Sequence, residues 1–136
     1  MHNRQRKIPI NAPALQRFAE KALAACRHEV RSTRVGNLPN EIHVLLVSDK
    51  RMSILHQRFL NQAGPTDVIT FHHGEIFISV PMARRQAREF GTSLVRELRL
   101  YIVHGLLHLQ GLDDGSPAGR RRMRAAETRV LRRITV

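Results

Sequence analysis

The chain has 136 residues, a length that fits one domain with a single core and excludes two independent ones. Its hydrophobic fraction of 42% is ordinary for a globular protein, whereas an aromatic fraction of 4% without tryptophan predicts an aliphatic core and few rings on which bases could stack. A formal net charge of +12, nearly all of it from arginine, favours nucleic acid over a membrane surface as the partner.

The N-terminal region is expected to hold a short strand and a long helix. The segment 7–10 fits a strand, and Asn11 can cap the helix that follows it. Cys26 falls on the apolar side of that helix, where a small buried side chain is expected, and as the single cysteine it excludes an intrachain disulfide. The stripe that should face the core consists of Leu15, Phe18, Ala19, Ala22, Leu23, Cys26 and Val30.

A turn, a strand and a second helix are predicted next. The segment 36–40 has the composition of a turn, and the apolar segment 41–47 predicts a strand. Ser48 then caps a helix. The apolar face of this helix carries Met52, Leu55 and Phe59, so its polar side should face solvent.

Two neighbouring strands are predicted in the middle of the chain. They follow a loop over 61–65 and occupy 67–71 and 75–80, which are rich in β-branched and aromatic residues. Gly74 lies where a tight link between them requires it.

The remaining chain is predicted to form three helices. Pro81 opens the first and Gly91 closes it, Thr92 caps the second, and Gly111 ends the second. Ser116, followed by proline, starts the last helix, whose apolar side carries Met123, Ala126, Val130, Leu131 and Ile134.

These elements predict a single α+β domain over residues 1–136, with about five helices packed around a small mixed sheet. The N-terminal apolar segment is too short for a signal peptide, and no apolar run approaches a membrane span. We therefore expect a cytoplasmic protein without a membrane partner.

A pair of histidines lies in the segment 94–109, which is apolar almost all round and so predicts a buried helix. His104 and His108 are four residues apart and project from one face, close enough for both to bind one metal ion. Taken alone, the pair is more often two core histidines satisfied by backbone or carboxylate acceptors.

The residues after this helix strengthen the case for a metal. Gly111 can reverse the chain so that Asp114 returns to the histidine face, although Asp113 could compete for that place. Three ligands with a fourth position free for water are typical of catalytic zinc. Glu97 and Tyr101 share the face of the histidines, and either could fix a ring tautomer.

The stretch from Val103 to Asp114 resembles the signature of the YbeY-type rRNA maturation factors, metal-dependent endoribonucleases of ribosome quality control. The similarity extends upstream through 65–71 and 74–79 and downstream through Met123, Glu127 and Leu131, and so covers most of the chain. The resemblance implies an α+β fold, zinc in a cleft, single-stranded RNA as substrate, and a role in maturing the 3′ end of small-subunit ribosomal RNA.

Two departures from the family pattern affect the expected chemistry. Asp114 stands where the family has a third histidine, and a carboxylate lowers the Lewis acidity of zinc and widens the range of divalent metals accepted. Leu60 stands where the family has an arginine after an aromatic residue. Arg58 is a possible substitute, although on a helix it points elsewhere.

Further residues are candidates for catalysis or substrate binding. Asp113 is a positional candidate for the general base. Thr66 and Asp67 either bind substrate or brace the start of a strand, and His72 and His73 are expected at the surface. An arginine cluster at the start of the last helix either guides phosphates into the cleft or forms a solvated face, and consists of Arg120, Arg121, Arg122 and Arg124.

The favoured hypothesis is a zinc-dependent, single-strand-specific endoribonuclease that processes ribosomal RNA on the ribosome or the small ribosomal subunit. The alternative is a catalytically weak or inactive ribosome-associated RNA-binding assembly factor. A zinc peptidase is disfavoured, because Gly105 occupies the place of the glutamate that serves such enzymes as general base.

Overall fold

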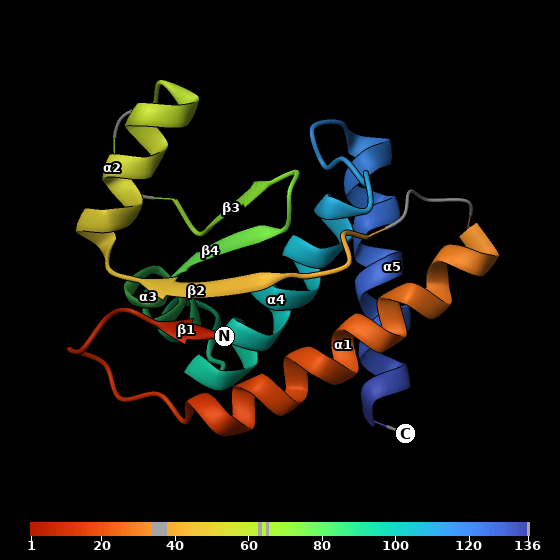
Figure 1. Cartoon of the computed structure of the whole chain (residues 1–136), viewed down its shortest axis with the longest axis horizontal. Coiled ribbons are helices and arrows are strands. Elements are labelled where there is room, and N and C mark those ends of the chain that lie inside the picture. Colours follow the sequence, from red (N-terminus) through yellow and green to blue (C-terminus); the bar gives the residue numbers. More distant parts are fainter. Residues whose placement is uncertain (34–37, 63, 65, 136) are drawn as a thin grey trace.

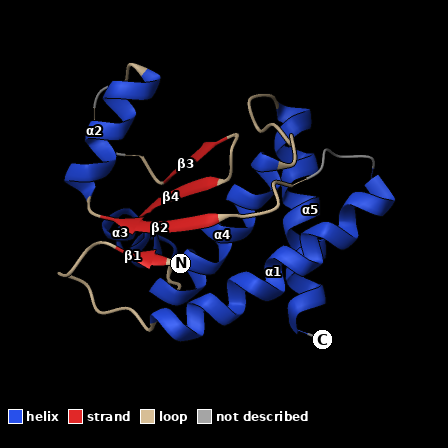
Figure 2. Cartoon of the chain, in the orientation of Figure 1, coloured by secondary structure: helices blue, strands red, loops and turns tan. Residues whose placement is uncertain are grey.

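The computed structural model describes residues 1–33, 38–62, 64 and 66–135 (Figure 1). In chain order, its elements are β1 (His2–Asn3), α1 (Ala12–Thr33), β2 (His43–Val47), α2 (Asp49–Leu60), β3 (Val68–Phe71), β4 (Glu75–Ser79), α3 (Val80–Phe90), α4 (Leu94–Leu109) and α5 (Pro117–Thr135). Figure 2 shows the strands as one sheet surrounded by helices. The described part of the chain thus has five helices and confirms the predicted α+β class.

The sheet is mixed, as predicted, with strand order β1-β2-β4-β3. Strands β1, β2 and β4 are parallel, and β3 pairs antiparallel with β4 at one edge. Val44 of β2 lies opposite Ile76 of β4, and Leu46 lies opposite Ile78. The strand order leaves β3 at the edge of the sheet.

Each face of the sheet has its own core, because side chains alternate between the faces along a strand. Val44, Leu46, Ile76 and Ile78 belong to the larger cluster, which they share with residues of α1, α4 and α5. The smaller cluster joins the sheet to α2 and consists of Leu45, Val47, Met52, Leu55, Ile69 and Phe77. Helix α2 therefore covers the face opposite to α4.

Helix α4 is the most buried helix next to the sheet, as its all-round hydrophobicity predicted. Gly105 explains how closely it approaches β4, because a Cβ atom added there would lie 2.7 Å from Cγ2 of Ile76. Residues on either side of Gly105 along the helix, including His104, are therefore held close to the sheet. None of the helices in the described residues combines the length and apolar character needed to cross a bilayer.

The strand predicted at 7–10 is wrong, since β1 lies earlier at His2–Asn3. The Gln5 side chain accepts from the Ile8 N–H at 3.0 Å and donates to the Ile8 carbonyl at 2.8 Å. These two bonds occupy the backbone groups of Ile8 that a neighbouring strand would need. The Ile8 side chain is instead buried as part of the larger core cluster.

Several helix starts are confirmed and one is wrong. Asn11 accepts from the Ala14 N–H, and Ser48 accepts from the Arg51 N–H, as caps do. Ser93, not Thr92, caps α4, because the Ser93 hydroxyl accepts from the Arg96 N–H at 3.1 Å. The predicted turn at 36–40 and loop at 61–65 each include positions outside the described residues.

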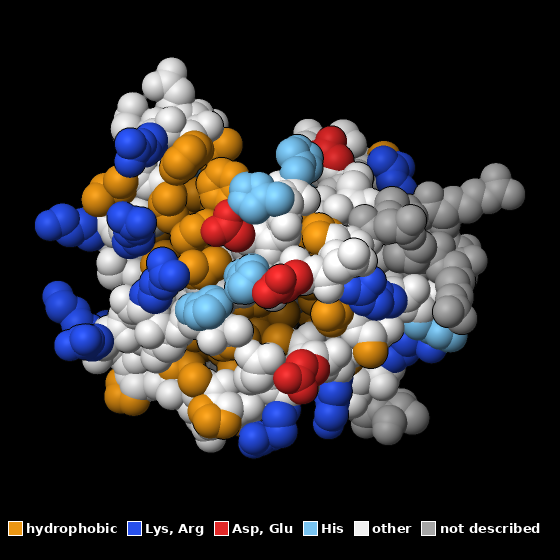
Figure 3. All heavy atoms as spheres, viewed as in Figure 1, with side chains coloured by type: hydrophobic (Ala, Val, Ile, Leu, Met, Phe, Trp, Pro, Cys, Tyr) orange, Lys and Arg blue, Asp and Glu red, His pale blue; other side chains and the backbone are white. Residues whose placement is uncertain are grey.

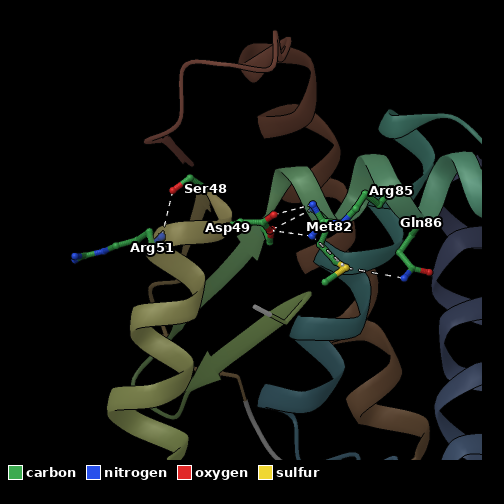
Figure 4. Close-up of polar contacts among 7 residues, drawn as sticks. Ser48, Asp49, Arg51, Met82, Arg85 and Gln86 are labelled. Carbon is green, nitrogen blue, oxygen red and sulfur yellow. Dashed lines mark hydrogen bonds and ion pairs between the residues drawn. The ribbon is translucent and has the colours of Figure 1, made fainter. Parts of the chain in front are cut away.

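An ion pair fixes the start of α2 against α3. Figure 4 shows Asp49 pointing toward Arg85, and the guanidinium donates to both carboxylate oxygens, at 2.7 and 3.0 Å. The buried Ser79 hydroxyl donates to the same carboxylate at 3.0 Å. The hydrogen bond from Arg85 lowers the pKa of Asp49; burial opposes this shift and Ser79 supports it.

Asp49→Asn is expected to lower the free energy of unfolding at neutral pH by about 1 kcal/mol, the upper range for a partly exposed pair. Because folding lowers the pKa of Asp49, its stabilising contribution is complete above the ordinary pKa of about 3.9 and is lost as pH falls through the lower folded value. Urea titrations of both proteins between pH 7 and pH 2 should therefore converge at acid pH. A difference that grows on acidification would contradict this account.

Candidate metal centre

Helix α4 places His104 and His108 side by side, one turn apart on the same face. Their Nε2 atoms lie 3.0 Å apart, and their rings meet edge to face with centroids 4.5 Å apart. Both side chains are only about a quarter exposed, 25% for His104 and 27% for His108. The two ring nitrogens thus face one small, partly enclosed volume.

Asp114 completes the group from the loop after α4. Gly111 has a φ of 101°, in the left-handed region that lets a helix end and the chain reverse. The Asp114 Oδ2 atom lies 3.4 Å from Nε2 of His104, and Oδ1 lies 3.6 Å from Nε2 of His108. One ligand atom from each residue falls within 4.8 Å of the others, an arrangement that could hold a metal ion.

The donor set fits zinc in chemistry and spacing. Ligand atoms around tetrahedral zinc, at about 2.0–2.1 Å from the ion, lie about 3.3 Å from one another. The separations here, from 3.0 to 3.6 Å, bracket that value. Two imidazole nitrogens and one carboxylate oxygen also leave a fourth position for water or substrate.

Glu127 of α5 fixes the orientation of His104. Its Oε1 atom lies 2.7 Å from Nδ1 of His104, and the carboxylate can only accept, so Nδ1 carries the proton and Nε2 presents its lone pair to the site. Burial favours the neutral ring of His104 and so lowers its pKa. The hydrogen bond and charge of Glu127, together with Asp114 and Asp67, outweigh burial and raise the pKa above its ordinary value.

The two residues that the sequence suggested for this orienting role do not perform it. The Glu97 carboxylate accepts from the Thr92 hydroxyl at 2.9 Å. The buried Tyr101 hydroxyl has no hydrogen-bond partner within the described residues. Among the features of the sequence, only the family resemblance indicated Glu127, since helical spacing cannot relate it to a residue on another helix.

Glu127→Gln is expected to weaken zinc affinity about 10-fold, because outer partners of metal-bound histidines contribute about 10- to 100-fold. The amide keeps the shape of the side chain but removes the charge that holds the Nδ1 proton of His104. Competition with a fluorescent zinc chelator measures the change. The matched control is Glu89→Gln, at an exposed position on α3, and equal affinities of the two variants would contradict the assigned role.

A cleft of about 370 Å³ opens over the three side chains. It is lined by Leu60 of α2, residues 67–70 at and along β3, and His104, His108 and Asp114. Figure 1 shows the end of α2 and the loop between α4 and α5 on opposite sides of β3, and Figure 3 shows the molecule hollowed between these parts.

Asp67 lies in this cleft and also braces the chain. Its Oδ1 atom accepts from the Val68 N–H at 2.7 Å and from the Thr66 hydroxyl at 3.4 Å. Its backbone carbonyl accepts from the Ser79 N–H at 2.9 Å. The two readings of Asp67, bracing and substrate contact, are therefore compatible.

Other predicted residues do not reach the cleft. The Asp113 Oδ1 atom accepts from the Gly115 N–H at 2.9 Å, and Asp113 lines a separate hollow together with Arg122. Arg58 is exposed on the last turn of α2, where Leu60 takes the position beside the histidines. Arg120 and Arg121 are exposed on α5 and do not line the cleft, and His72 and His73 are exposed as expected.

A family model described as Endoribonuclease YbeY matches residues 1–135. The chain belongs to the YbeY family. Relatives named Endoribonuclease YbeY include a protein from Heliobacterium modesticaldum, 35% identical over 93% of this chain and 87% of the relative. A second, from Geobacter metallireducens, is 31% identical over 95% of this chain and 90% of the relative.

A solved structure supports the same YbeY-like fold. The solution structure of TM1509 from Thermotoga maritima superimposes with a TM-score of 0.65 and 26% identity, covering 97% of this chain and 86% of that one. The resemblance drawn from the segment around His104 and His108 is thus confirmed over nearly the whole chain.

Proposed function

We propose that this chain is a metal-dependent endoribonuclease that cleaves single-stranded ribosomal RNA. Its proposed role is maturation of the 3′ end of small-subunit ribosomal RNA and ribosome quality control. We expect it to act in the cytoplasm, on the ribosome or the small ribosomal subunit, and to do so as a single domain. The proposal depends chiefly on the convergence of His104, His108 and Asp114 in a cleft of a YbeY-family chain. The net charge of +12 suits a polyanionic substrate.

We assign His104, His108 and Asp114 as the ligands of one zinc ion, which would supply Lewis acidity and lower the pKa of a bound water. Glu127 holds the ring of His104 in the orientation that ligation requires. Asp67 faces the same cleft with Oδ1 engaged by Val68, which leaves Oδ2 as a proton acceptor or as a partner for a ribose hydroxyl. A zinc peptidase is not supported. Such enzymes place a glutamate general base directly after the first histidine, and this position is held here by Gly105, which packs against Ile76.

The test combines metal content with RNA cleavage. Freshly purified protein is expected to hold about one zinc ion per chain. Single-stranded RNA from the 3′ end of the small-subunit transcript should be cleaved, chelator should stop cleavage, and added zinc should restore it. A zinc-loaded protein that leaves this RNA intact would count against the endoribonuclease. If manganese or magnesium restores more activity than zinc, that metal becomes the proposed ion, a result that the carboxylate ligand would explain.

The second candidate function is an RNA-binding assembly factor with weak or no turnover. One observation favours it: among the described residues, those that line the cleft include Leu60 and no arginine. RNA affinity that falls with salt, does not respond to chelator and is accompanied by no products under any metal would select this function.

Leu60→Arg separates the two candidates further. Leu60 is half exposed at the cleft wall, so a longer cationic side chain can enter without displacing the core. If the metal centre is competent, a guanidinium beside it should raise cleavage at least about 10-fold, because one charge-stabilising donor contributes about 10²–10³-fold. Leu60→Met is the control for a change of shape alone. Tighter RNA binding without any cleavage in the arginine variant would favour the assembly factor.

A further inference from the structure

An exposed aromatic ring lies next in the chain to a residue that lines the cleft. Phe59 is 56% exposed at the end of α2, directly before Leu60, which lines the cleft with the two histidines. Removing an aromatic ring from water is favourable. An aromatic ring that stays exposed beside a candidate active site is therefore a candidate contact for a bound partner. Figure 3 shows hydrophobic side chains gathered over this side of the molecule, with Lys and Arg side chains at its outer edge.

The ring is held from behind by other aromatic side chains. Phe71 of β3 meets Phe59 edge to face, with centroids 5.3 Å apart and an interplanar angle of 81°. Phe71 in turn meets the buried Phe77 edge to face at 5.7 Å. This chain of contacts leads from the core to the surface and fixes the tilt of the Phe59 ring while leaving more than half of it in solvent.

We propose that Phe59 is a stacking platform for one base of a single-stranded RNA whose backbone enters the cleft. This inference rests on the proposed function and adds a determinant of substrate binding to it. A nucleobase suits the site because a flat aromatic ring can stack on any of the bases, and because Leu60, the next residue along the chain, lines the cleft that would hold the phosphate. Arg58 is exposed on the same helical turn and can pair with an adjacent phosphate.

A protein partner is the less favoured occupant of this surface. Apolar protein interfaces bury a broad patch, whereas the exposed large apolar residues of α2 are Ile54, Phe59 and Leu60 only, among the described residues. The strongly basic chain also favours a partner with repeated negative charge.

The first test uses fluorescence, because the chain contains no tryptophan. Phe59→Trp introduces one fluorophore at the proposed platform, and Phe90→Trp introduces one at a matched exposed position, 66% exposed at the end of α3 and away from the cleft. With chelator present to prevent cleavage, single-stranded RNA should quench the first tryptophan and leave the second unchanged. Equal responses of the two variants would overturn the proposal.

The second test measures affinity by anisotropy, again with chelator. Phe59→Ala and Phe59→Leu should both weaken RNA binding by about 5- to 100-fold, the range for loss of one stacked base, while Phe90→Ala should not. Removing single bases along the RNA should weaken binding to the wild type at one position and have no further effect at that position in Phe59→Ala. If Phe59→Leu binds RNA as tightly as the wild type, the contact is apolar and not aromatic stacking, and the proposal is wrong.

The two tests do not depend on turnover. Quenching and affinity loss without any cleavage would reject the endoribonuclease and keep the platform. Cleavage that survives in Phe59→Ala with unchanged affinity would keep the enzyme and reject the platform.

Discussion

Replacing His104 by alanine is expected to remove the bound metal and to lower RNA cleavage by at least about 100-fold, because loss of an outer partner alone costs about 10- to 100-fold. His104 supplies one of the three donor atoms and is the residue through which Glu127 acts. Plasma emission spectroscopy of the purified variant measures the metal, and cleavage of single-stranded ribosomal RNA measures the activity.

The control for this variant is His72→Ala, at an exposed position between β3 and β4 outside the cleft. It should retain full metal content and activity. Since His104 is partly buried and bonded to Glu127, circular dichroism must show that the alanine variant is folded. A folded His104→Ala protein that keeps stoichiometric zinc would exclude this group as the metal centre.

The second large effect is expected from Gly119→Ala at the start of α5. A Cβ atom there would lie 2.3 Å from the Asp113 carbonyl oxygen and 3.1 Å from the Ser116 hydroxyl. The loop that contains Asp114 must therefore move or α5 must shift. We expect a loss of about 1–3 kcal/mol in the free energy of unfolding, as for overpacking of a core. Zinc affinity should also fall by about 10-fold or more as Asp114 is displaced.

Ala125→Gly distinguishes a displaced loop from general loss of stability. This exposed helical position on α5 should lose about 1 kcal/mol through helix propensity alone. Its zinc affinity should match the wild type. If both variants lose affinity in proportion to their stability, then the loop geometry is not what determines metal binding.

Much of the fold could be predicted because its signals are local. The all-round apolar segment that became α4, the cap at Ser48 and the reversal at Gly111 each depend on a few adjacent residues. The same locality brought His104 and His108 together, since one helical turn fixes their spacing.

The errors arose where distant or competing groups decide the outcome. Segment 7–10 has strand-like residues, but the Gln5 side chain takes the backbone bonds of Ile8. Thr92 and Ser93 are both good caps, and Thr92 is instead drawn to Glu97.

Within the candidate site, the sequence could not distinguish Asp113 from Asp114. The structure turns Asp113 toward the Gly115 N–H and Asp114 toward the histidines. Glu127 could not be found from spacing, because its contact with His104 is made between two helices. Contacts that depend on the tertiary packing of separate elements cannot be predicted from the periodicity of the sequence.

The three proposed ligands and Glu127 all belong to the segment 104–127, which spans the end of α4, the loop and the first half of α5. An ion that binds only the folded arrangement stabilises the docking of α5 on α4. Above the dissociation constant, this stabilisation rises with the logarithm of the metal concentration. The free metal concentration would therefore influence how often the C-terminal helix α5 opens locally. The rate of amide hydrogen exchange along α5 should then be lower in the metal-bound protein than in the metal-free protein, even when no RNA is present.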